Sequence, residues 1–155
     1  MVIVEFNQNI IPGKSVNMFR NSFKLFGNQI RSLSTQTRQA LEQAVKEDPV
    51  VLFMKGTPNQ PMCGFSLRAI QVLSLENVAT DKLATYNVLS NEELRDGIKE
   101  FSDWPTIPQL YINGEFVGGC DILMSMHKSG ELHKVLGEIN ALASSKPEGE
   151  AAGAN

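Results

Sequence analysis

The segment Val50–Met54 (VVLFM) restricts the fold of this chain more than any other feature of its sequence. All five residues are apolar, without the polar alternation of a half-buried strand, which is typical of a strand buried on both faces. Helical patterns flank it at 38–47, where Thr37 is the expected N-cap, and at 63–75. Because a doubly buried strand needs helices on both sides of its sheet, the sequence predicts an α/β domain.

Three further strands and three further helices follow from patterns of the same kinds. The strands are expected at 83–89, 109–112 and 115–117. The helices are expected at 91–101, 122–128 and 131–142. Ser90 or Asn91 is the expected N-cap of the first of these helices, and Asp121 is that of the second. Asn113-Gly114 favours a tight hairpin between the last two strands. A βαβ unit followed by a hairpin indicates a small mixed four-stranded sheet with helices on both faces. In the helix at 63–75, Phe65 is expected on the inward face.

The folded domain is predicted to cover 35–143, between two segments of different character. Residues 1–34 form an N-terminal extension that is basic and serine-containing after Met18, as in a mitochondrial transit segment, so the mitochondrial matrix is the expected location. The first seventeen residues fit this pattern less well, as they would if translation began at Met18. The alternative is a disordered tail without a targeting signal. Residues 144–155 have no apolar face to bury and are predicted to be disordered.

Charge and cysteine content exclude several classes of function. The formal net charge is −3, with +3 in residues 1–34 and −6 in the rest of the chain, which argues against nucleic acid as a partner. No apolar run reaches the length of a membrane span, so no membrane partner is expected. Two cysteines, Cys63 and Cys120, are too few for a disulfide scaffold, although the sequence leaves open whether they pair. Thiol chemistry in a reducing compartment is the favoured use.

Cys63 stands where a loop gives way to a helix. The N-terminal end of a helix favours an anion, and Lys55 adds a cation at the end of the preceding strand, so the pKa of the Cys63 thiol is expected to be lowered. The alternative is a small apolar residue of the helix. Ser66 occupies the position that holds the second cysteine in a Cys-x-x-Cys enzyme. Further on, a cis bond before Pro108 would turn the Ile107 backbone outward to meet an extended peptide.

Four separated motifs resemble a known family. They are Lys55, Cys63-Gly64-Phe65-Ser66, Trp104-Pro105-Thr106-Ile107-Pro108 and Gly118-Gly119-Cys120-Asp121. Together, over residues 36–143, the sequence is similar to the monothiol (CGFS-type) glutaredoxins of the thioredoxin fold, in their single-domain mitochondrial form. The resemblance implies a glutathione site.

In that site, the resemblance implies a physical role for each matching residue. Lys55 and Arg95 would bind glutathione carboxylates, and the Ile107 backbone before a cis Pro108 would pair with the cysteinyl backbone. The backbone N–H groups of Cys120 and Asp121 would bind the γ-glutamyl carboxylate, the Asp121 side chain its ammonium group, and Phe65 would lie along the ligand. Alternatively, Arg95 and Lys99 only solvate a helix face and Asp121 only caps its helix. Trp104 is expected to pack behind the proline turn.

The resemblance also implies a function as a carrier of a [2Fe–2S] cluster. Such a cluster in an all-thiolate site needs four thiolates, which Cys63 from each of two chains and two glutathiones would supply in a cluster-bridged homodimer. Scaffold, chaperone and acceptor proteins of mitochondrial iron–sulfur assembly would be partners, together with BolA-type proteins.

Two other functions remain open on the sequence. The first is a glutathione-dependent thiol–disulfide oxidoreductase with Cys63 as nucleophile and Cys120 as a slow resolving thiol. The second is an adaptor with residual thiol activity. His127 and His133 have no metal-like spacing and are expected at helix ends or on the surface, whereas Met124 and Met126 are expected to fill the core or an interface.

Overall fold

A five-stranded mixed sheet forms the centre of the computed structural model, which describes residues 2–3 and 33–143. In spatial order the strands are β1 (Val2–Ile3), β3 (Leu83–Asn87), β2 (Val50–Met54), β4 (Gln109–Ile112) and β5 (Glu115–Gly118). β1, β3 and β2 run parallel, whereas β4 is antiparallel to β2 and to β5. The predicted four-stranded mixed sheet is confirmed as β2 to β5. The two-residue β1 was not predicted, because its partner β3 lies 82 residues away in the sequence.

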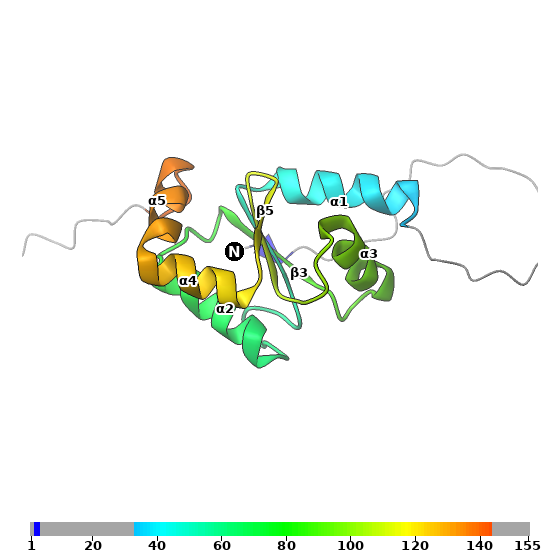
Figure 1. Cartoon of the computed structure of the whole chain (residues 1–155), viewed down its shortest axis with the longest axis horizontal. Coiled ribbons are helices and arrows are strands. Elements are labelled where there is room, and N and C mark those ends of the chain that lie inside the picture. The colour runs from blue at the N-terminus through cyan, green and yellow to red at the C-terminus, as the bar shows by residue number, and fades with distance from the viewer. Residues whose placement is uncertain (1, 4–32, 144–155) are drawn as a thin grey trace, which may run out of the picture.

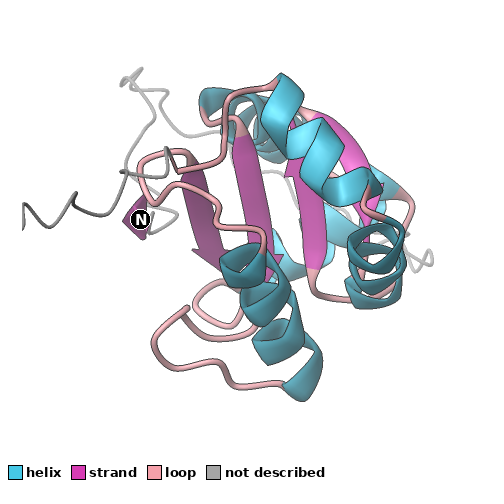
Figure 2. Cartoon of the chain, turned by 90° about the vertical axis from the view of Figure 1, so that its left-hand side faces the viewer, coloured by secondary structure: helices cyan, strands magenta, loops and turns pink. Residues whose placement is uncertain are grey.

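Helices cover both faces of the sheet, as predicted. They are α1 (Thr35–Glu47), α2 (Gly64–Leu75), α3 (Glu92–Ser102), α4 (Cys120–Ser129) and α5 (Glu131–Glu138). The strands pass between α2, α4 and α5 on one side and α1 and α3 on the other (Figure 1), and a second view shows the strands side by side between the helices (Figure 2). The predicted transit segment and C-terminal tail fall largely on residues 4–32 and 144–155, outside the described residues.

β2 explains why there are two cores. All five of its side chains are buried, and successive residues of a strand point to opposite faces of its sheet. Val50, Leu52 and Met54 join the core under α2, α4 and α5, whereas Val51 and Phe53 join the core under α1 and α3. The unbroken apolar run thus serves both layers at once.

Three details of the helices differ from the predictions. Ser34 caps α1 in place of Thr37, since its hydroxyl accepts a hydrogen bond from the Thr37 N–H at 3.1 Å, while the Thr37 hydroxyl donates to Glu93 of α3. α4 begins at Cys120 with Gly119 as N-cap, so Asp121 lies in the first turn of the helix and does not cap it. Phe65, in the first turn of α2, is 55% exposed and does not face inward as predicted, because it lies at a cleft and not over the core.

Several other element boundaries follow the sequence patterns. Asn91 caps α3 by accepting a hydrogen bond from the Leu94 N–H at 3.1 Å. Asn113 and Gly114 connect β4 to β5 with φ of 49° and 82°, a left-handed conformation that favours these two residue types. α5 ends at Glu138, four residues before the predicted end.

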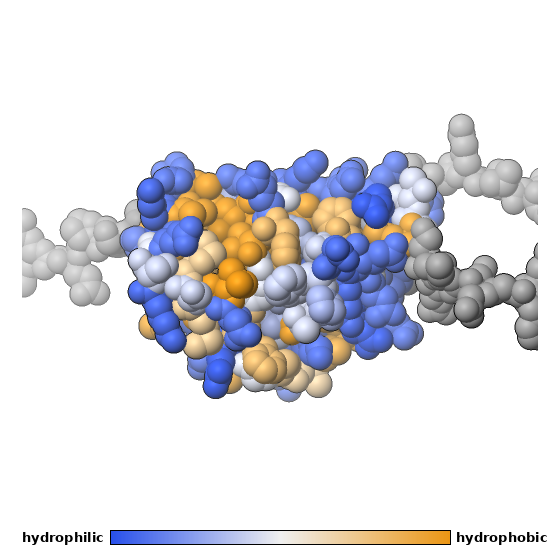
Figure 3. All heavy atoms as spheres, viewed as in Figure 1, coloured by the Kyte–Doolittle hydropathy of each residue, from blue (hydrophilic) through white to orange (hydrophobic). Residues whose placement is uncertain are grey.

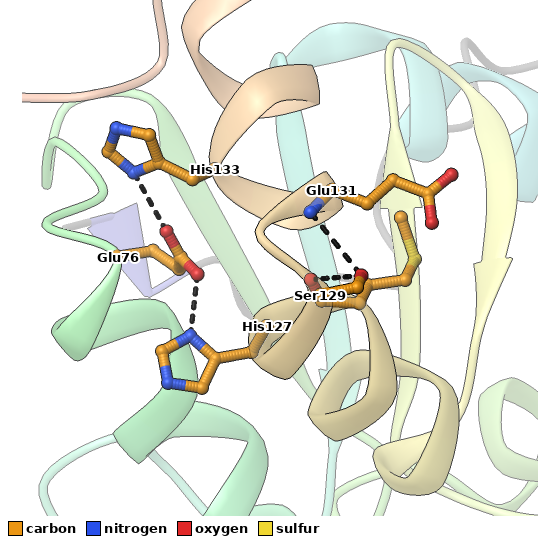
Figure 4. Close-up of polar contacts among 6 residues, drawn as sticks. Glu76, His127, Ser129, Glu131 and His133 are labelled. Carbon is orange, nitrogen blue, oxygen red and sulfur yellow. Dashed lines mark hydrogen bonds and ion pairs between the residues drawn. The ribbon is translucent and has the colours of Figure 1, made fainter.

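A buried carboxylate joins the ends of three helices. Glu76, the C-cap of α2, has a side chain that is only 5% exposed and lies between two imidazoles (Figure 4). Its Oε1 is 2.6 Å from Nδ1 of His127 in the last turn of α4, and its Oε2 is 2.9 Å from Nδ1 of His133 in α5. The two histidines are thus at or near helix ends, as predicted, and they share one carboxylate.

The surface is divided between apolar and hydrophilic regions. On the face shown in Figure 3, apolar residues gather over α4, α5 and β5, whereas the half over α3 is hydrophilic. Met124 and Met126 of α4 are half-buried and pack against the adjacent core, as predicted. Of the helices in residues 33–143, none is both long and apolar enough to cross a membrane.

Candidate functional site

A cleft of about 740 Å³ opens at one end of the sheet, where β2 and β3 end and β4 begins. The starts of α2 and α4 and one side of α3 complete its walls. All eight residues of the predicted site line this cleft: Lys55, Cys63, Phe65, Arg95, Ile107, Pro108, Cys120 and Asp121. The fold therefore brings together residues that are far apart in the sequence, as the glutathione-site prediction requires.

Cys63 is the N-cap of α2 and is half-buried at the edge of the cleft. The pKa of its thiol is lowered, chiefly by a hydrogen bond from the Ser66 backbone N–H. The Phe65 N–H, the charge of Lys55 and the Ser66 hydroxyl lower this pKa further, whereas partial burial of the thiol acts in the opposite direction. These are the effects expected at a helix N-terminus, where unpaired N–H groups stabilise a thiolate. The thiol is thus both accessible and activated.

The hydroxyl of Ser66 makes a structural hydrogen bond. The residue is fully buried, and its Oγ accepts a hydrogen bond from the Lys55 backbone N–H at 3.0 Å. This contact joins the first turn of α2 to the end of β2. The position that would carry a second thiol in a dithiol enzyme therefore holds α2 against the sheet.

The loop between Lys55 and Cys63 closes on itself. Lys55 C=O accepts a hydrogen bond from the Met62 N–H at 2.9 Å, and the backbones of Thr57 and Gln60 exchange two bonds of 3.1 and 3.0 Å. Gly56 has a φ of 87°, and a Cβ atom there would lie 2.4 Å from the Gln60 carbonyl oxygen. The loop therefore needs glycine at this position to deliver Cys63 to the cleft.

The opposite wall of the cleft is the loop 104–108. The Ile107–Pro108 peptide bond is cis, and within the described residues the Ile107 backbone has no hydrogen-bond partner. Trp104 packs behind the loop, as predicted, with its ring 5.6 Å from that of Phe116 in β5. This wall presents free backbone groups to whatever fills the cleft.

Known proteins share this sequence and this arrangement. The glutaredoxin family model matches residues 50–117. Monothiol glutaredoxin-5, mitochondrial, from Schizosaccharomyces pombe is 84% identical over 138 residues, which are 89% of this chain and 88% of that protein. The chain belongs to the monothiol glutaredoxin family. Its mitochondrial localisation, predicted from the N-terminal composition, is confirmed by such relatives.

Solved glutaredoxins share the fold. The solution structure of a monomeric truncated mutant of 1-C-Grx1 from Trypanosoma brucei is 39% identical, with a TM-score of 0.61 over 69% of this chain and 94% of that chain. The crystal structure of a buckwheat glutaredoxin–glutathione complex, at 24% identity, has a TM-score of 0.60 over 70% of this chain and 94% of that one. The thioredoxin-like fold predicted for this glutaredoxin is thereby confirmed.

The cleft of this glutaredoxin is more basic than the chain as a whole. Lys55, Arg95 and Lys99 line it against one carboxylate, that of Asp121. Arg95 is also 3.3 Å from Glu92 and 3.5 Å from Asp96, both on the surface of α3, whereas no carboxylate among the described residues pairs with Lys55 or Lys99. A cleft with these charges favours a ligand that carries more than one negative group.

Some cleft residues were not among the predicted ligands. Lys99 lies four residues after Arg95, hence on the same face of α3, a spacing that the sequence already contains. Leu89 and Ile122, which are 43% and 40% exposed, complete an apolar rim with Phe65. Nothing in the local sequence marks these two, since they meet only through the fold.

The second thiol differs from the first. Cys120 is buried at the start of α4, and the pKa of its thiol is raised by that burial and by the charge of Asp121. A negative charge on Cys63 raises this pKa slightly further, and both cysteines are free thiols. Within residues 2–3 and 33–143, no three His, Cys, Asp or Glu side chains are arranged to hold a metal ion.

Proposed function

We propose that this glutaredoxin carries a [2Fe–2S] cluster as cargo in mitochondrial iron–sulfur assembly, with glutathione as co-ligand. One observation carries the proposal: each chain offers a single accessible, activated thiol, and the fourth motif position is committed to a buried hydrogen bond through Ser66. Cys63 can therefore act as a terminal thiolate ligand, while fast disulfide formation within the motif is absent. A ligand site fits this arrangement better than a dithiol reductase does.

Glutathione matches the charges and backbone groups of the cleft. One of its two carboxylates suits the cluster of Lys55, Arg95 and Lys99, and its ammonium group suits Asp121. Its peptide backbone suits the unpaired N–H and C=O of Ile107, in the manner of an added strand. The N-terminal turn of α4, where Cys120 and Asp121 lie, suits the γ-glutamyl carboxylate. A buckwheat relative of the same fold is described as a glutathione complex.

The ligand count leads to a dimer. Four thiolates complete an all-thiolate [2Fe–2S] site, and one chain with one glutathione supplies two of them. Two chains that meet at their clefts would supply all four. The exposed apolar side chains around Cys63, with Met62 67% and Phe65 55% exposed, suit such a contact and suit docking of scaffold, chaperone, acceptor and BolA-type proteins.

Anaerobic reconstitution of the full chain with iron, sulfide and glutathione tests this proposal. We expect a coloured species that elutes as a dimer, and we expect it to be lost when glutathione is omitted or when Cys63→Ser is made. Cys120→Ser is expected to retain the colour, because only the backbone at that position is assigned a role. A colourless monomer from the wild-type chain, with soluble iron and sulfide present, would contradict the carrier function.

The activated Cys63 thiol also favours a second function, that of a glutathione-dependent oxidoreductase. Cys63 thiolate would attack the disulfide of a glutathionylated protein, which forms a Cys63–glutathione disulfide and releases the protein thiolate. A second glutathione thiolate would then release oxidised glutathione and regenerate Cys63. Steady turnover of a glutathionylated peptide by iron-free protein, abolished in Cys63→Ser, would establish this activity. If the iron-free protein shows no turnover, the oxidoreductase function is ruled out and the carrier function is the one that remains.

A further inference from the structure

Gln109, the first residue of β4, makes an unusual set of contacts for a strand residue. Its side chain is fully buried, and its Nε2 donates hydrogen bonds to the Trp104 carbonyl oxygen at 3.0 Å and to the Thr106 carbonyl oxygen at 3.2 Å. Both protons of the carboxamide are therefore used. Its Oε1 accepts a hydrogen bond from the Tyr111 hydroxyl, at 3.5 Å, two residues along the same face of the strand.

The loop that Gln109 holds has little else to hold it. Pro105 and Pro108 have no N–H, so two of its five residues can donate no backbone hydrogen bond. The Trp104 N–H donates to the Lys99 carbonyl, which anchors the start of the loop to α3, but the indole Nε1 of Trp104 is buried without a partner among the described residues. Three carbonyls lie between that anchor and the cis peptide bond, and the Gln109 carboxamide bonds two of them, those of Trp104 and Thr106.

The position of this loop determines where one wall of the cleft lies. All five of its residues, 104 to 108, line the cleft, and the unpaired backbone of Ile107 lies among them. The loop also lies against the start of α4, where a Cβ at Gly119 would lie 3.3 Å from Trp104 Nε1 and 3.4 Å from the Pro108 carbonyl oxygen. A shift of the loop would therefore change the distance between Ile107 and the α4 N-terminus, the two backbone sites proposed for glutathione.

We propose that Gln109 is a positioning residue for glutathione, and that its carboxamide fixes the 104–108 loop so that the Ile107 backbone meets the ligand. This inference rests on the proposed glutathione site. Gln109 is not among the residues that line the cleft. Its carboxamide protons bond two carbonyl groups of the loop, and none of its side-chain hydrogen bonds reaches Cys63 or Ser66.

The test compares full-length wild type with Gln109→Met, which keeps the side-chain length but removes both donors. Titration calorimetry with reduced glutathione is expected to show affinity lowered about tenfold, the loss of two hydrogen bonds to the loop. Fluorescence of Trp104, the one tryptophan of the chain, is expected to shift and to become more accessible to a quencher. The pH dependence of Cys63 alkylation is expected to stay the same. Gln43→Met, on the exposed face of α1, is the matched control.

A second variant separates positioning from a general loss of packing. Gln109→Glu keeps the shape but places a carboxylate oxygen against two carbonyl oxygens, so affinity is expected to fall further than in Gln109→Met at neutral pH. It is expected to recover partly, relative to wild type at the same pH, once acid protonates the introduced carboxyl and restores one donor. If Gln109→Met does not fold, Gln109→Asn, whose amide is too short to reach both carbonyls, takes its place.

The outcomes separate this inference from the function on which it rests. Wild type that does not bind glutathione would overturn the glutathione site itself. Wild type that binds, with affinity in Gln109→Met or its substitute within twofold, would overturn the positioning role alone. A parallel change in Cys63 alkylation would also overturn it, because the defect would then extend beyond the loop.

Discussion

At the scale of single residues, Cys63 and Cys120 show how position sets the chemistry of one functional group. Both begin a helix and both line the same cleft, yet the pKa of one thiol is lowered and that of the other is raised. Hydrogen bonds from the Ser66 and Phe65 N–H groups stabilise the Cys63 thiolate. Burial and the adjacent Asp121 disfavour a thiolate at Cys120. Of the two thiols, Cys63 is therefore the one whose thiolate form is favoured.

The first prediction concerns the reactivity of these two thiols. Alkylation of Cys63 with iodoacetamide, followed by mass spectrometry across a pH series, is expected to have a midpoint below that of an unstructured thiol, because thiolate is the reacting form. Cys120 is expected to react slowly and with a higher midpoint. Lys55→Gln should move the Cys63 midpoint upward, whereas Lys134→Gln on exposed α5 should not. Equal midpoints for both thiols in wild type would contradict the assigned environments.

At the scale of helices and strands, sequence patterns predicted every element after β1 and their order, but long-range contacts decided the details. β2 was predicted to the residue because an unbroken apolar run needs no knowledge of its neighbours. The cap of α1 was assigned wrongly to Thr37, whose hydroxyl is used by Glu93 of α3, 56 residues away. Phe65 was expected to face inward but is exposed at the cleft, because helical periodicity cannot show that the first turn of α2 lines a cleft.

The same limit applies to the candidate site. Seven of its eight residues lie in short motifs that resemble a family, and Arg95 was assigned only from what the same resemblance implies. Gln109 lies directly after one of those motifs, yet its role was missed. From the sequence, a glutamine in a strand is expected to be an exposed polar residue. Only the structure reveals that this carboxamide is buried and donates to two carbonyls of the loop.

The second prediction concerns the contact that joins α2, α4 and α5. Glu76→Ala removes a buried acceptor shared by two imidazoles and should lower the free energy of unfolding by about 1–3 kcal/mol, measured by urea denaturation. His127→Ala should cost more than His133→Ala, because His127 is closer to the carboxylate and less exposed, 34% against 65%. The control Glu138→Ala, on the exposed side of α5, should change stability by less than about 0.5 kcal/mol. No difference between Glu76→Ala and this control would show that the cluster does not stabilise the fold.

At the scale of the whole molecule, the two cores differ in their aromatic content: among the described residues, the buried ones under α2, α4 and α5 include no aromatic side chain. The core under α1 and α3 holds the aromatic group of Phe53, Tyr86 and Tyr111, with ring centroids 5.0 and 5.7 Å from Phe53. Both tyrosines are 2% exposed, and they are the two tyrosines of the chain. Burial raises the pKa of Tyr86 to about 12, aided by Glu47 and Asp48, and burial also raises that of Tyr111 to about 12.

The third prediction follows from these two pKa values. A raised pKa means that the folded state favours the neutral phenol, so this stabilisation is fully present below the ordinary pKa of 10.0 and is lost as pH rises through about 12. Tyrosinate absorbance and far-ultraviolet circular dichroism, followed on the same samples, should therefore change together in this range. In denaturant both tyrosines should titrate near their ordinary value. Ionisation near pH 10 with the fold intact would contradict the burial of this core.

The cleft lies where the two helical layers meet at one end of the sheet. α2 and α4 contribute from one layer and α3 from the other, so a molecule that fills the cleft contacts both. Binding to the folded state alone shifts the folding equilibrium by mass action, about 2.7 kcal/mol at a ligand concentration one hundred times the dissociation constant. A higher concentration of such a ligand would then protect the folded chain against heat and proteolysis.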